Sequence, residues 1–297
     1  MTTSEIYEPL RKSRSAWHDV RGVRYHVREW GTADAPLVVL LHGWGDASAS
    51  FQFMVDKLES DWFVVAPDWR GFGLSRYRTH SYWFPDYVAD LDVLLSIYQP
   101  KQSVFLLGHS MGANAAGLYA GVFPERVRGF VNVEGFGLAD REPEKAPENY
   151  RGWIESSRSL RGYQTYSGYD ELASRILKRA PAMSVDKAQF VARHWASEEG
   201  GHIVLHADPA HKLPNAVLYR RAEASACWDR VEAEVLLVLG EDTEFRADMR
   251  AWLDPDESRH PFRGARTEVV AGAGHMIHIE KPGELARITE AFLGDLV

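Results

Sequence analysis

The chain has 297 residues and a single cysteine, and its formal net charge is −8 at neutral pH. Hydrophobic residues make up 45% of it and charged residues 26%, a composition that is ordinary for a globular protein and excludes extended disorder. The negative charge excludes the basic surface that nucleic acid or an anionic membrane would require. Because Cys227 stands alone, no intramolecular disulfide and no oxidising compartment are implied.

The N-terminus, Met1–Ile6, has no basic region followed by an apolar run, so we expect no secretory leader. The longest apolar runs, such as Pro36–Leu41, are far shorter than a membrane span. These features predict a cytoplasmic protein that binds neither membranes nor nucleic acid.

Short apolar runs alternate with helix-like segments along most of the chain. A hairpin is expected over Trp17–Trp30, and a helix over Tyr87–Ile97, where apolar residues recur at helical spacing. This alternation predicts an α/β fold with a mostly parallel central sheet flanked by helices. The other predicted strands are Leu37–Leu41, Trp62–Ala66, Val104–Leu107, Val127–Val133, Val235–Leu239 and Arg266–Val270, and a closing helix is predicted over Pro282–Leu293.

One stretch breaks the alternation. Residues 138–215 are polar and helix-like, without a clear buried strand, and they carry several aromatic side chains. An insertion of this length between two core strands is expected to form a helical cap over the strand ends. We therefore divide the chain into a core of residues 1–137 and 216–297 and a cap of residues 138–215.

The sequence Gly108-His109-Ser110-Met111-Gly112 directly follows the predicted strand Val104–Leu107. It has the form G-x-S-x-G, in which glycines allow a sharp strand-to-helix turn that presents a serine. A serine hydroxyl is nearly unreactive alone and needs a neighbouring base to accept its proton. The motif in this setting predicts that Ser110 is a nucleophile.

Three other segments also follow predicted strands: His42–Gly45, Asp68–Ser75 and Gly272–His275. Together with the serine turn they resemble the α/β-hydrolase fold family, in the esterase-like and lipase-like branch that has a serine nucleophile and a helical cap. In an open parallel sheet, the ends of the strands are where ligands bind. We expect Asp68 and Arg70, within the second segment, to pair with each other.

The resemblance implies roles for three residues besides Ser110. His275, which follows the last predicted strand through a glycine-rich loop, would be the general base. The backbone N–H groups of Trp44 and Met111 would form the oxyanion hole. His42 and His109 are expected mainly to orient loops, and together with Phe136 they are also candidates for lining the substrate pocket.

The acidic partner of His275 is where the chain departs from the family pattern. The family places an aspartate three residues after the glycine that ends the strand Val235–Leu239, and this chain has Thr243 there. Asp242 lies one residue too early, whereas Glu134 follows the strand Val127–Val133, where some haloalkane dehalogenases carry a glutamate. We favour Glu134 and keep Asp242 as the alternative acid, with Glu241, Glu244 or no acid as further possibilities.

The nucleophile selects the chemistry that the resemblance implies. Haloalkane dehalogenases and epoxide hydrolases of this fold use an aspartate where this chain has Ser110. We therefore expect hydrolysis of a carboxylic ester or lactone with an apolar part, without a cofactor or metal, in a monomer or homodimer. The alternatives are a carbon–carbon bond hydrolase, a haloperoxidase-like enzyme on the same residues, or a non-catalytic ligand-binding homologue.

Overall fold

The computed structural model describes residues 6–253 and 261–297. Of the N-terminal segment Met1–Ile6, for which no secretory leader is expected, all but Ile6 lies outside the described residues. Its main sheet has eight strands in the order β1-β2-β4-β3-β5-β6-β9-β10. β1 and β2 are antiparallel to their neighbours and the remaining pairs are parallel, as predicted. The strands are β1 (Arg14–Val20), β2 (Val23–Trp30), β3 (Leu37–Leu41), β4 (Phe63–Pro67), β5 (Val104–His109), β6 (Val127–Val133), β9 (Glu234–Gly240) and β10 (Arg266–Val270).

Helices cover both faces of this sheet. In β3, Leu37, Val39 and Leu41 point to one hydrophobic core and Val38 and Leu40 to the other, as alternation along a strand requires. The first core is closed by α2 (Phe84–Tyr98), α3 (Met111–Val122), α7 (Arg221–Trp228) and α8 (Arg246–Trp252), and the second by α1 (Gln52–Val55), α9 (Ile277–Glu280) and α10 (Pro282–Gly294). Within the described residues, no helix is long and apolar enough to cross a membrane.

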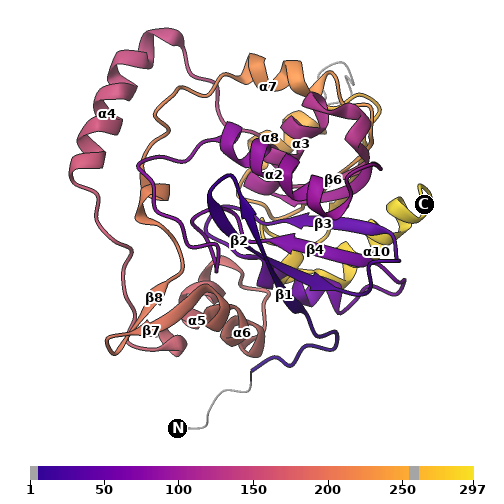
Figure 1. Cartoon of the computed structure of the whole chain (residues 1–297), viewed down its shortest axis with the longest axis horizontal. Helices are drawn as coiled ribbons and strands as arrows, with labels where there is room; N and C mark the ends of the chain where they lie inside the picture. Colours follow the sequence, from indigo (N-terminus) through magenta and orange to yellow (C-terminus); the bar gives the residue numbers. More distant parts are fainter. Residues whose placement is uncertain (1–5, 254–260) are drawn as a thin grey trace.

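The segment between β6 and β9 lies outside the main sheet (Figure 1). It contains α4 (Ala146–Arg158), α5 (Tyr169–Arg179), α6 (Val185–Trp195) and a hairpin of β7 (Ala196–Glu199) and β8 (His202–Leu205). The hairpin was not expected. Its signal was the turn Gly200-Gly201, because both glycines have a positive φ, which the tight turn between two strands favours. A third hydrophobic core joins α5 and α6 to Phe53 of α1.

The predicted pairing of Asp68 with Arg70 is wrong. Asp68 instead lies 2.8 Å from Nδ1 of His26, and its carboxylate also accepts backbone N–H groups of Ser48 and Leu74. Arg70 points to α2, where its guanidinium donates two hydrogen bonds to Asp90. The two side chains diverge because each has its own buried partner elsewhere in the fold.

Candidate active site

Ser110 occupies a strained turn between β5 and α3. Its φ of 52° and ψ of −116° lie in a region that side chains other than glycine rarely adopt. A Cβ at Gly108 would lie 2.4 Å from Cα of Ala113, and one at Gly112 would lie 2.2 Å from the carbonyl oxygen of Leu41. Only glycine fits at both positions, which explains the spacing of the motif around the serine.

Glu134 and His275 meet at the carboxyl ends of β6 and β10. Nδ1 of His275 lies 3.1 Å from Oε2 of Glu134, whose side chain is buried. The same oxygen accepts a hydrogen bond of 2.5 Å from the Thr243 hydroxyl, and Oε1 accepts one of 2.7 Å from the backbone N–H of Gly240. Three donors therefore converge on this carboxylate and hold it in an orientation that faces the imidazole.

The alternative acid, Asp242, points away from this arrangement. Its side chain is 62% exposed and lies 3.7 Å from the guanidinium of Arg246. The next residue, Thr243, is fully buried and donates to Glu134. This role of Thr243 was not predicted from the sequence. Its place at the position where the family has an aspartate was the feature that could have indicated it.

Two backbone donors face the same end of the sheet. Trp44 lies in the loop after β3, and Met111 is the first residue of α3, where a backbone N–H has no partner within the helix. Among residues 6–253 and 261–297, no hydrogen bond uses the N–H of either residue. The positive end of the α3 dipole also lies at Met111, so the site favours a negatively charged oxygen.

A cavity of about 860 Å³ brings these residues together. Ser110, Glu134 and His275 all line it, and so do Trp44 and Met111. Within the described residues, the Ser110 hydroxyl makes no hydrogen bond to His275. In enzymes without bound substrate, the distance between a nucleophile and its base is often too long for a hydrogen bond and shortens when substrate binds.

Of the three predicted pocket residues, only Phe136 lines this cavity. His42 is fully buried beside it and accepts a hydrogen bond of 2.9 Å from the backbone N–H of Trp69. His109 is also buried, and its Nε2 lies 2.9 Å from the carbonyl oxygen of His275. Both rings bind backbone groups of neighbouring loops, as expected of residues that orient loops, so the pocket-lining role expected for them is wrong.

Comparison with known proteins agrees with this fold. A family model described as alpha/beta hydrolase fold matches residues 36–282. The chain belongs to the α/β-hydrolase family. A serine hydrolase-like protein of Danio rerio is 28% identical over 295 residues, which cover 93% of this chain and 86% of the relative.

Two further relatives span most of this α/β-hydrolase. Esterase YbfF of Escherichia coli is 24% identical over 266 residues, covering 87% of this chain and 93% of the esterase. The crystal structure of a hypothetical protein from Pseudomonas aeruginosa superimposes with a TM-score of 0.82 and 27% identity, covering 95% of this chain and 99% of the other. The fold and the hydrolase family are thus established.

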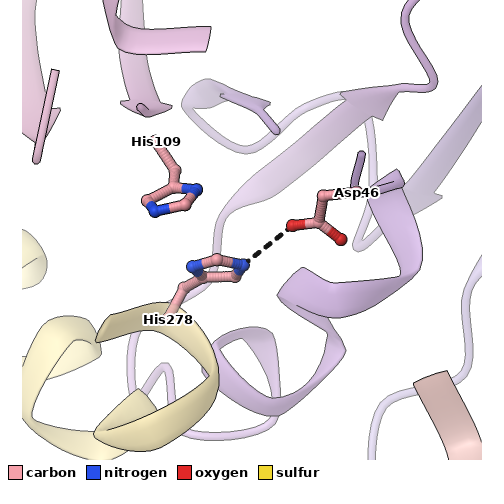
Figure 2. Close-up of side chains that lie close together, drawn as sticks. All are labelled: Asp46, His109 and His278. Carbon is pink, nitrogen blue, oxygen red and sulfur yellow. Dashed lines mark hydrogen bonds and ion pairs between the residues drawn. The ribbon is translucent and has the colours of Figure 1, made fainter. Parts of the chain in front are cut away.

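Near the serine turn of this α/β-hydrolase lie three buried side chains, one carboxylate and two imidazoles, of the types that can bind a metal ion. Ligand atoms of Asp46, His109 and His278 lie within 4.8 Å of one another (Figure 2). However, the Asp46 carboxylate already accepts hydrogen bonds from the backbone N–H of Ala47, Ser50 Oγ and Trp195 Nε1, and lies 3.0 Å from His278 Nε2. Through these hydrogen bonds, Asp46 links the loop after β3 to helix α6, by Trp195, and to helix α9, by His278.

The ring of His109 ties the serine turn to the loop that carries His275. A carbonyl oxygen can only accept, so Nε2 of His109 must carry the proton shared with the His275 carbonyl. Burial, followed by the nearby His278 and His275 rings, holds the pKa of His109 well below its usual range. The ring is neutral as a result, and this contact persists across the neutral pH range.

Replacing His109 by leucine removes this contact and is expected to lower kcat/KM about 10²-fold, the cost of a displacement of about 1 Å near a reacting group. His109→Gln, whose amide can donate to the same carbonyl, should recover part of the loss. Steady-state kinetics on a chromogenic ester would test both variants. Equal losses in the two would contradict a role for the donated hydrogen bond.

Proposed function

We propose that this protein is a serine hydrolase that cleaves a carboxylic ester or lactone. The observation that carries the proposal is the Glu134–His275 contact in the same cavity as Ser110, which stands on a strained strand-to-helix turn. A nucleophile, a base and an oriented acid are the groups that acyl transfer requires. The name of the Escherichia coli esterase supports the same reaction class.

The proposed reaction begins when Ser110 Oγ attacks the carbonyl carbon and its proton passes to Nε2 of His275. Glu134 accepts the hydrogen bond from Nδ1–H and stabilises the imidazolium that forms. The backbone N–H groups of Trp44 and Met111 would bind the negatively charged carbonyl oxygen. His275 then gives its proton to the leaving alcohol, and a water molecule, activated by His275, releases the acid from the acyl-enzyme.

The substrate is proposed to be a small molecule with an apolar part. The cavity volume of about 860 Å³ is within the range of pockets that bury most of the surface of a small molecule. Its wall is rich in aromatic side chains, which favour apolar groups. These are Trp44, Tyr82, Trp83, Phe84, Tyr87, Phe136, Tyr219 and Phe245.

A fluorophosphonate probe tests the nucleophile directly. We expect one covalent adduct per chain, located on Ser110 by mass spectrometry of peptides, and no adduct on the Ser110→Ala variant. A panel of p-nitrophenyl esters of increasing acyl length should then be hydrolysed. Folded wild-type protein that takes up no probe would contradict the proposal, whereas labelling without turnover of any ester would favour the carbon–carbon hydrolase alternative.

A further inference from the structure

One polar side chain in the wall of the cavity around Ser110 has no part in the proposed reaction. Asn114 lies on α3, four residues after Ser110, and lines the same cavity. Its backbone N–H donates to the Ser110 carbonyl oxygen at 3.0 Å, which closes the first turn of the helix. Because one turn rises about 5.4 Å and residues four apart share a helix face, the Asn114 side chain lies close to the nucleophile.

A neighbouring loop fixes the orientation of the Asn114 amide. Oδ1 accepts a hydrogen bond of 2.8 Å from the backbone N–H of Gly137, in the loop after β6. A backbone N–H can only donate, so the oxygen must face Gly137 and the NH₂ group must point away from it. Among the described residues, Nδ2 makes no hydrogen bond, and it is not one of the atoms that the protein encloses without a partner. Asn114 is only 7% exposed and lines the cavity, so its open NH₂ group faces that space.

Other donors in the cavity wall are bonded within the protein. The Tyr82 hydroxyl donates to Asp208, and Trp44 Nε1 donates to the His211 carbonyl oxygen. The second asparagine of the wall, Asn149, donates its NH₂ group to the carbonyl oxygens of Asn215 and Ala216. Asn114 differs from them because its donor is left for a ligand. A substrate that displaces water from this amide must supply an acceptor, since an unpaired donor weakens binding.

We propose that Asn114 selects substrates whose acyl part carries a second oxygen acceptor, as in a 4-oxoacyl ester. This inference rests on the proposed serine hydrolase reaction. The acyl group stays attached to Ser110 through both steps, so it is the part of the substrate whose position next to α3 is fixed. The acceptor is placed on its fourth carbon because three carbon–carbon bonds and a carbonyl group span about one helical turn.

Two esters of equal length test this preference. In p-nitrophenyl 4-oxopentanoate the fourth carbon carries an oxygen, and in p-nitrophenyl 4-methylpentanoate a methyl group takes its place. The quantity measured is the ratio of their kcat/KM values, after subtraction of each uncatalysed rate. In Asn114→Leu this ratio is expected to fall about tenfold relative to the wild-type protein, because the donor that binds the oxygen is gone. The two esters differ in intrinsic reactivity, but that difference cancels when the ratios of two proteins are compared.

Asn114→Asp separates the lost donor from a displaced loop. An aspartate keeps an oxygen for the Gly137 N–H but has no NH₂ group, and above neutral pH its carboxylate is ordinarily ionised and only accepts. The ratio should therefore fall in Asn114→Asp as it does in Asn114→Leu. A fall in Asn114→Leu alone would assign the effect to movement of the loop after β6 and would overturn the proposal.

Leu213→Ala is the matched control, because Leu213 lines the same cavity and its side chain offers no hydrogen bond. It should change the kcat/KM values of both esters by similar factors, and a tenfold fall of their ratio in this variant would overturn the proposal. Hydrolysis of both esters with one ratio in the wild-type protein and in both Asn114 variants would overturn the role of Asn114 alone. Absence of hydrolysis of either ester by folded wild-type protein would overturn the proposed function, and this inference with it.

Discussion

Replacing Glu134 by glutamine is expected to lower kcat about 10⁴-fold, as loss of the acid does in an analogous triad. The carboxylate accepts from the Gly240 N–H, from the Thr243 hydroxyl and from Nδ1 of His275. An amide has one oxygen and one NH₂ group, so it cannot accept both from the Gly240 N–H, which binds Oε1, and from Thr243 and His275, which bind Oε2. His275 would lose the partner that fixes its tautomer and stabilises its positive charge.

Asp242→Asn is the control for this prediction. Asp242 is exposed and pairs with Arg246, so its neutral variant should keep nearly wild-type kcat. Both variants can be compared by steady-state kinetics on a p-nitrophenyl ester, after circular dichroism has shown that each is folded. A large loss in Asp242→Asn with little change in Glu134→Gln would reverse the assignment of the acid.

The position of Glu134 shows why an acid can move between strands without a change in the site. β6 and β9 are neighbouring parallel strands, with Val133 paired to Val238. Glu134 leaves the end of β6 with a φ of 56°, and its side chain reaches across to Gly240 at the end of β9. The glutamate thus occupies the place beside His275 that an acid from β9 would otherwise fill, and Thr243 on that loop becomes its donor.

Much of the fold could be predicted from local sequence patterns, because they reflect local geometry. Strand-length apolar runs predicted the six parallel strands, and the glycines around Ser110 predicted the turn that the structure contains. Local patterns could not decide between Glu134 and Asp242 as the neighbour of His275. That choice depends on how the ends of β6, β9 and β10 meet, which only the assembled sheet determines.

The errors concern side chains whose partners are distant in sequence. His109 contacts the carbonyl of His275, 166 residues away, and Arg70 contacts Asp90 rather than Asp68. In each case the segment was placed correctly in the fold, but the role or partner predicted for its buried polar side chain was wrong. Hydrogen-bond partners of buried groups follow from the packing of elements, and no spacing along the chain encodes them.

The Arg70–Asp90 contact predicts a large effect on stability. Nε and Nη2 of Arg70 lie 2.5 Å and 2.6 Å from the two carboxylate oxygens of Asp90, which is fully buried. Replacing Arg70 by methionine keeps most of the volume but leaves the Asp90 charge short of its main partner. Breaking one side of a buried ion pair costs about 3–5 kcal/mol, so urea unfolding should show a loss of that size.

A second variant distinguishes a lost partner from lost packing. Arg70→Met/Asp90→Leu removes both charges, and it should recover part of the free energy of unfolding because no uncompensated charge stays buried. The recovery is partial because the buried Tyr25 hydroxyl loses Asp90 as its acceptor. Arg287→Met, which breaks an exposed pair with Glu284, should leave the unfolding midpoint unchanged. If the double variant were no more stable than Arg70→Met, loss of packing rather than the stranded Asp90 charge would explain the destabilisation.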